Sequence, residues 1–155
     1  MRFSGSVSIA APRDRVWAFV IDPEQVGHCG PGVETIEVVD PSHFKATAKV
    51  GIGFISARFQ VNLEMTEQQA PERAVIKAHG QAPGSAVDAT AEMHLSDGQD
   101  GKTVMDWTAD VAIAGTLASV GARLIEGTAN KMIAQTFDCI RSKLEGRSAS
   151  DATSD

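Results

Sequence analysis

The chain has 155 residues, enough for one domain around a single hydrophobic core. Hydrophobic residues make up 43% of it and charged residues 22%, a composition that excludes wholesale disorder. Acidic residues outnumber basic ones by 20 to 14, so the chain lacks the broad positive charge of nucleic-acid-binding proteins, and no nucleic-acid partner is expected.

Compartment signals are weak but consistent. The longest uncharged stretch that bears on membrane insertion, Val111–Ala122, is far shorter than the ~20 residues of a membrane-spanning helix. The start, Met1–Ala10, has no apolar core of a secretory signal. Two cysteines cannot make a disulfide framework and fit a reducing compartment. These features predict a cytoplasmic protein.

The first third of the chain alternates between strand and helix signals. Arg2–Ile9 alternates apolar residues with serines, which predicts a half-buried strand. Pro12 suits the first turn of a helix whose apolar side includes Val16 and Trp17. A short helical turn begins at Asp22-Pro23 and ends in the glycine- and proline-rich segment Gly27–Gly32.

The middle of the chain keeps a period of two, with turn residues between the runs and no helical segment. This pattern predicts consecutive antiparallel strands. The expected strands are Val33–Val39, Phe44–Val50, Ile55–Met65, Ala74–Gln81, Val87–Leu95 and Thr103–Ile113.

The period then changes to three or four residues, which predicts one long amphipathic helix over about Thr116–Glu145. The polar, serine-rich segment Gly146–Asp155 is predicted to be a disordered tail. The chain is therefore expected to form one domain over residues 1–145, of the α+β class, in which a curved antiparallel sheet of about seven strands is covered by the C-terminal helix.

The predicted inner face of the sheet is rich in alanine. Such a face indicates either a close approach of helix and sheet or a retained cavity, and strong curvature favours the cavity. The residues expected to line it, as ligand-binding residues, are Trp17, Phe44, Phe59, Ala89, Met93, Trp107, Leu117, Leu124 and Met132.

The two ends of the predicted sheet differ in charge. The connections at one end are charged, whereas Gly27–Gly32, Gly51–Phe54, Gly80–Ala86 and Ala114–Ser119 carry no formal charge. These four are either short tight turns or the rim of a mouth that meets an apolar ligand, membrane or partner. In the second interpretation Ile52, Phe54, Pro83 and Leu117 lie near the surface around the mouth.

No catalytic constellation is visible. Cys29 beside His28 has no residue to orient the histidine, so Cys29 is interpreted as a small buried residue, and Cys139 lies alone on the last helix. The histidines lack metal-ligand spacing, and His79 and His94 fall on the outer face by parity. No metal or cofactor is expected, and a binding protein is favoured over an enzyme.

Three segments resemble the CoxG family, named for the G subunit of carbon monoxide dehydrogenase. Asp22-Pro23 followed by Cys29-Gly30-Pro31-Gly32-Val33-Glu34 is similar to its "DP…C-x-PG-x-E" segment. Lys49–Gly53 followed by Arg58-Phe59 is similar to "KVG-x-G…RF", and Gly121–Gly127 with Lys131 resembles its last-helix segment. Pro12–Trp17 resembles the "P-x-x-x-VW" start of the wider START-like (SRPBCC) superfamily.

The resemblance implies a helix-grip (START/Bet v1-like) fold around an apolar cavity. It also implies an accessory protein that recruits a molybdenum-containing hydroxylase, such as carbon monoxide dehydrogenase, to the membrane or handles a lipophilic quinone for it. Cys29 and Pro31, from the first matched segment, join the expected portal. The polar end of the chain favours transient contact with the inner membrane face over a permanent anchor. A small START-like enzyme (lyase, cyclase or hydrolase) and a ligand-free assembly factor are the alternatives.

Overall fold

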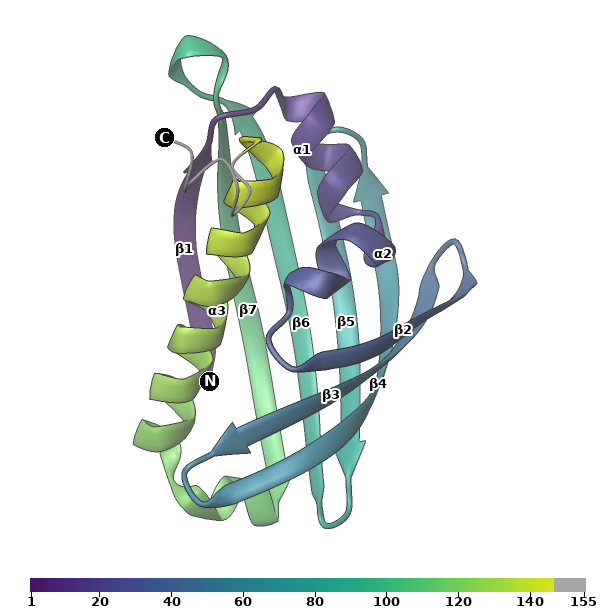
Figure 1. Cartoon of the computed structure of the whole chain (residues 1–155), viewed down its shortest axis with the longest axis vertical. Helices are drawn as coiled ribbons and strands as arrows, with labels where there is room; N and C mark the ends of the chain where they lie inside the picture. Colours follow the sequence, from purple (N-terminus) through teal and green to yellow (C-terminus); the bar gives the residue numbers. More distant parts are fainter. Residues whose placement is uncertain (147–155) are drawn as a thin grey trace.

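The computed structural model describes residues 1–146. Its main element is a seven-stranded, fully antiparallel sheet in the order β1-β7-β6-β5-β4-β3-β2. The strands are β1 (Arg2–Ile9), β2 (Val33–Asp40), β3 (His43–Ile52), β4 (Ile55–Gln69), β5 (Arg73–Ala82), β6 (Ser85–Asp97) and β7 (Thr103–Gly115). The sheet curves around the helices, as Figure 1 shows.

The helical elements lie on the concave side of the sheet (Figure 1). Between β1 and β2 the chain forms α1 (Arg13–Val20), α2 (Pro23–Val26) and the short 3-10 helix η1 (Gly27–Cys29). Asp22 caps α2 by accepting a 3.0 Å hydrogen bond from the Glu24 amide. A further 3-10 turn, η2 (Gln99–Gly101), joins β6 to β7. The predicted order of elements is confirmed.

The C-terminal helix begins later than predicted. The expected helix over Thr116–Glu145 is divided into a 3-10 helix, η3 (Thr116–Val120), and α3 (Ala122–Leu144). Gly121 separates them with a φ of 98°, a left-handed conformation that an α-helix cannot contain and that glycine adopts without strain. The apolar period continues through the break, so the period alone could not locate it. Of the predicted tail, residues 147–155 lie outside the described residues.

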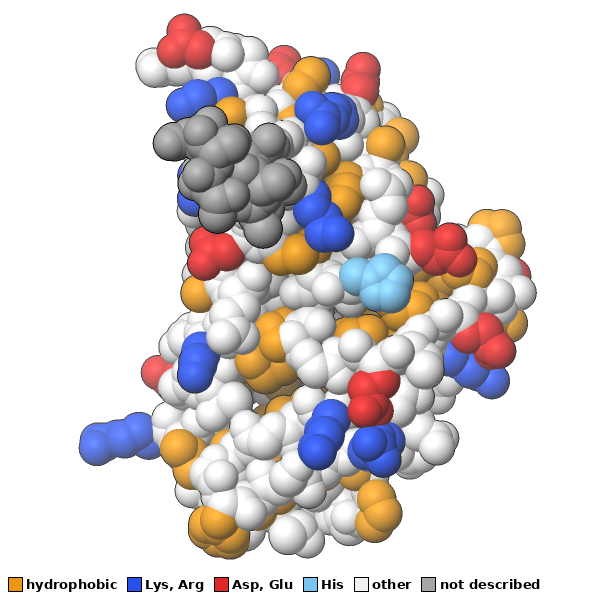
Figure 2. All heavy atoms as spheres, viewed as in Figure 1, with side chains coloured by type: hydrophobic (Ala, Val, Ile, Leu, Met, Phe, Trp, Pro, Cys, Tyr) orange, Lys and Arg blue, Asp and Glu red, His pale blue; other side chains and the backbone are white. Residues whose placement is uncertain are grey.

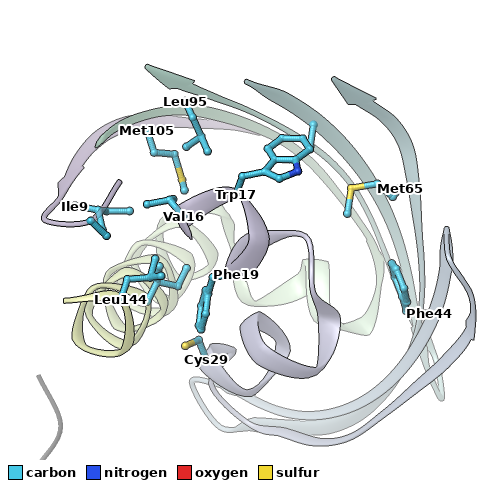
Figure 3. Packing of buried hydrophobic residues seen from close by; sticks show 13 residues of the cluster. Ile9, Val16, Trp17, Phe19, Cys29, Phe44, Met65, Leu95, Met105 and Leu144 are labelled. Carbon is cyan, nitrogen blue, oxygen red and sulfur yellow. The ribbon is translucent and has the colours of Figure 1, made fainter. Parts of the chain in front are cut away.

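Buried apolar side chains form two clusters at opposite ends of the concave face. The upper cluster joins α1 to the last turn of α3, and its members Ile9 and Val16 are fully buried (Figure 3). The lower cluster contains Ile52, Phe59 and Leu117, near the turns between β3 and β4 and between β5 and β6. No helix within residues 1–146 has the length and hydrophobicity needed to cross a membrane.

Candidate functional site

An apolar cavity of about 470 Å³ lies between the concave face of the sheet and α3. The sheet contributes residues from β2 to β7, α3 contributes residues between Met132 and Ile140, and the segment after η1 contributes Gly30 and Pro31. A second apolar lobe of about 260 Å³ extends between α2 and strands β2 to β4. Val26, Gly30 and Thr136 line both lobes, so the two adjoin. This size is typical of sites for drug-sized apolar ligands.

Small side chains leave the space open. Ala91 on β6 faces Ala109 on β7 in the strand register, and both line the larger lobe. Ala46 and Ala48 of β3 line the smaller one. Packed interiors usually contain few voids larger than a water molecule. Here the row of methyl groups on the concave face of the curved sheet leaves volume that no neighbouring side chain fills. The structure thus contains the cavity that the alanine-rich face predicts.

An aromatic pair forms part of the wall of the larger lobe. The rings of Trp107 on β7 and Phe137 on α3 lie 5.5 Å apart, centroid to centroid, at 35°. Trp107 also lies against Gly5 of the neighbouring strand β1, its partner in the register. A Cβ atom at Gly5 would approach the indole to 3.0 Å, so only glycine leaves room for this ring position.

The cavity is accessible from outside. Trp107, Met132, Ile133 and Phe137 are only half-buried, although all four face the interior. Figure 2 shows apolar side chains in a hollow between α3 and the β2–β3 strands. Apolar surface that stays accessible inside a fold is a feature of ligand sites rather than of closed cores.

Acid–base groups are scarce in the wall. Glu92 is the one ionisable residue among those that line the two lobes. Its carboxylate accepts hydrogen bonds from Arg73 Nε at 2.8 Å and His94 Nε2 at 2.7 Å. The bond from Arg73, followed by that from His94, holds the pKa of Glu92 below its usual range. Because this carboxylate lies with His94 on the outer face of the sheet and is already paired, it is a poor general acid or base for a ligand in the cavity.

His43, His79 and His94 lie on the outer surface of the sheet. His79 pairs with Asp88, and His43 pairs with Asp40 and Glu64. The predicted outer placement of His79 and His94 is confirmed. Within residues 1–146, no three side chains of the His, Cys, Asp or Glu type gather as metal ligands would.

The prediction that the two cysteines are unpaired is wrong. Cys29 of η1 and Cys139 of α3 form a disulfide, with Cα atoms 5.4 Å apart across a sequence separation of 110 residues. Cys29 is buried, as expected, but neither cysteine is alone. The helical phase of α3 turns position 139 toward η1, which residue spacing could not reveal because the contact depends on how α3 crosses the sheet. In Figure 3 the sulfur of Cys29 points toward α3.

The predicted ligand-binding residues fall into two groups, those that line the cavity and those that do not. Phe44, Met93, Trp107 and Met132 line the two lobes. The others do not: Trp17 is buried in the upper cluster, Phe59 and Leu117 are in the lower cluster, Ala89 is outside both linings, and Leu124 is 41% exposed. Parity along a strand identifies the inward face correctly, but it does not reveal where along the strand the space lies.

The predicted portal residues also separate. Pro31 lines the larger lobe, and Phe54 is 94% exposed at the tip of the β3–β4 hairpin. Pro83 lines a different, partly polar groove with Arg58 and Gln81. The expectation that Ile52 and Leu117 lie near the surface is wrong, because both are buried in the lower cluster.

A hydrogen bond explains the position of Leu117. Its amide donates to Ser85 Oγ at 3.0 Å, which holds η3 against the start of β6. The isobutyl group is thereby placed inside the fold. The segment Gly27–Gly32 also does not join the uncharged end, since η1 lies midway along the concave side (Figure 1).

Sequence reasoning missed Gly5, Ile133 and Phe137. The apolar stripe of the last helix could have identified Phe137, because that residue belongs to it. The sequence around Gly5 does not reveal its role, because that role depends on pairing with Trp107, which is distant in the sequence.

The profile of the family described as the carbon monoxide dehydrogenase G subunit (CoxG) matches residues 5–145. The chain belongs to the CoxG family. The match begins within β1 and includes the other six strands and α3, so the family assignment and the cavity refer to the same unit. Among curated proteins, no sequence matches this CoxG-family chain.

Solved structures confirm the helix-grip, START/Bet v1-like fold. A conserved protein from Geobacillus kaustophilus is similar at a TM-score of 0.88 with 22% identity, covering 94% of this chain and 96% of its own. A START superfamily protein from Mycobacterium smegmatis gives a TM-score of 0.71 with 14% identity over 95% and 99% of the two chains. The Zhui aromatase/cyclase from Streptomyces sp. R1128 gives 0.69 with 17% identity over 97% of each chain. At these identities the likeness shows the fold alone.

Proposed function

We propose that this CoxG-family protein is a non-enzymatic carrier that holds a lipophilic molecule in its cavity and serves a molybdenum-containing hydroxylase, such as carbon monoxide dehydrogenase, at the membrane. The observation that carries the proposal is the accessible apolar cavity beneath Trp107 and Phe137. Family membership supports the enzyme partner. An isoprenoid quinone is the candidate ligand, because the cavity offers apolar walls, an aromatic pair and an adjoining second lobe.

A carrier role fits the chemistry of the wall better than catalysis does. The one ionisable lining residue, Glu92, is engaged by Arg73 and His94. Binding therefore rests on burial of apolar surface, which stabilises a complex by roughly 25 cal/mol for each Å² removed from water. One of the structural neighbours is an aromatase/cyclase, so a small START-like enzyme is the alternative function.

Docking at a membrane would use the tip of the β3–β4 hairpin. Phe54 is almost fully exposed there, and the adjacent Gly53 packs so closely on Leu124 that a Cβ atom at Gly53 would lie 2.8 Å from Leu124 Cδ2. Phe54 thus directly follows a glycine that packs against Leu124, which is itself 41% exposed. We place the protein in the cytoplasm, with transient contact at the inner membrane face.

Ligand binding is tested with a variant in which a large side chain fills the cavity. Ala109→Trp places an indole in the larger lobe, whereas Ala112→Trp puts the same group on the exposed outer side of the same strand. Each variant and the wild type are mixed with a membrane lipid extract and examined by native mass spectrometry. We expect retained lipophilic molecules on the wild type and Ala112→Trp but not on Ala109→Trp. A wild type that retains nothing would support the ligand-free assembly factor instead.

The test of docking removes the exposed ring. Phe54→Asp should reduce co-sedimentation with vesicles of bacterial phospholipid, because an aspartate at the contact must be desolvated. The matched control is Val39→Asp, which changes another apolar residue, 53% exposed, at the opposite end of the sheet. Equal losses in the two variants would remove the hairpin tip from the proposal.

A further inference from the structure

The disulfide joins two segments that line the cavity on opposite sides. Gly30 and Pro31, directly after Cys29, line the larger lobe, and so do Phe137 and Ile140, on either side of Cys139. The smaller lobe likewise includes Gly27 and Thr136. The Cys29–Cys139 bond therefore closes the gap between η1 and α3 beside the cavity.

Other restraints across this gap are weak. Within the described part of the chain, no hydrogen bond or ion pair joins residues 22–33 to α3. Without the covalent bond, apolar contacts alone would hold η1 against α3.

The two cysteines differ in accessibility. Cys29 is 5% exposed, whereas Cys139 is half-buried on α3. Thiol–disulfide exchange requires the attacking thiolate to reach a sulfur, so we take Cys139, the more exposed residue, as the position of attack. In a reducing compartment, a disulfide is usually redox-responsive rather than a permanent support.

We propose that the Cys29–Cys139 disulfide is a reducible latch that retains the ligand when formed and releases it when a dithiol reduces it. A thiolate of the dithiol attacks Cys139 Sγ, the Sγ–Sγ bond breaks, and its electron pair leaves on Cys29 Sγ, which takes up a proton. The second thiol of the dithiol then displaces Cys139 as a thiol. The dithiol is oxidised to its own disulfide, and the protein gains two thiols. The latch rests on the proposed function, because it regulates the same cavity.

The experiment measures release of the uncharged apolar probe N-phenyl-1-naphthylamine into an excess of lipid vesicles by stopped flow. The samples are the oxidised wild type, the wild type reduced with dithiothreitol that is then removed under nitrogen, and Cys139→Ser with and without the same treatment. We expect release to become about tenfold faster on reduction, since changes in affinity act mainly on dissociation. Cys139→Ser should release the probe fast in both samples.

Hydrogen exchange on the reduced wild type gives a second measurement that needs no variant. The latch predicts that exchange speeds up more in Gly27–Val33 and in α3 than in the central strands, whose exchange follows only the loss of global stability. An increase of the same size in all of these segments would make the bond a general stabiliser and overturn the latch. Equal release rates in oxidised and reduced protein would also overturn it while leaving ligand binding intact. Failure of the probe to bind any sample would instead remove the proposed function and the latch with it.

Discussion

The two halves of α3 use the same apolar stripe in different ways. Near its C-terminal end, Ile140 and Leu144 are 4% and 2% exposed in the upper cluster. In its middle, Met132 and Ile133 face the sheet but remain half-buried beside the cavity. The difference comes from α1, which adds a further layer of side chains only at the upper end (Figure 3). A stripe thus shows which way a helix faces, whereas neighbouring elements decide whether that face is filled.

The largest expected effect is a difference in unfolding free energy between a substitution in the filled upper cluster and one in the cavity wall. Ile9→Ala removes a fully buried side chain of the upper cluster and should cost about 2–5 kcal/mol in the free energy of unfolding. Ile133→Ala, the same change in the cavity wall, should cost less than about 1.5 kcal/mol because its side chain already adjoins empty space. Urea denaturation measures both. Equal losses would mean that the cavity closes in solution.

The disulfide should affect stability next. Cys139→Ser removes a cross-link that spans 110 residues and should lower the unfolding free energy by roughly 2–4 kcal/mol, chiefly by freeing the unfolded chain. The matched measurement is the wild type denatured in dithiothreitol, which should lose a similar amount. A variant as stable as the oxidised wild type would show that the bond adds little to the upper cluster.

The chain has two tryptophans, one in the filled upper cluster and one in the cavity wall. Trp17 is buried in the upper cluster, and Trp107 lines the cavity. A bromoalkane such as 1-bromooctane should quench the fluorescence of Trp17→Phe, which keeps Trp107, because heavy-atom quenching requires near contact. Trp107→Phe, which keeps Trp17, should be quenched far less. Equal quenching of the two variants would place the probe outside the cavity.

The smallest effect concerns the outer surface, which belongs to neither region. The hydrogen bond to Asp40 raises the pKa of His43 above its ordinary value of 6.5. The resulting stabilisation is complete below about pH 6.5 and is lost as the pH rises through the raised pKa of the folded state. Denaturation between about pH 6 and pH 8 should therefore show a slightly steeper loss of stability for the wild type than for His43→Asn. Identical slopes would contradict the assignment.

Much of the fold could be predicted from periodicity, because the strands and the last helix have one buried side and one solvated side. The strand from Ile55 and the apolar stripe of α3 are clear examples. Features that depend on contacts between elements distant in the sequence could not be predicted from periodicity. The disulfide requires α3 to cross η1, and the burial of Leu117 requires the hydrogen bond to Ser85. Of the candidate site, periodicity identifies the inward residues Met93, Trp107 and Met132, but the position of the empty space depends on where α1 covers the sheet.

The contact between Gly5 and Trp107 gives the neighbouring strand control over the shape of the cavity. A methyl group at position 5 would stand 3.0 Å from the indole, so the ring would have to shift by a few tenths of an ångström. The shape of the cavity can therefore change through Gly5, a residue that is not part of its lining. When related cavities are compared for selectivity, the position opposite the tryptophan on β1 is as informative as the lining itself.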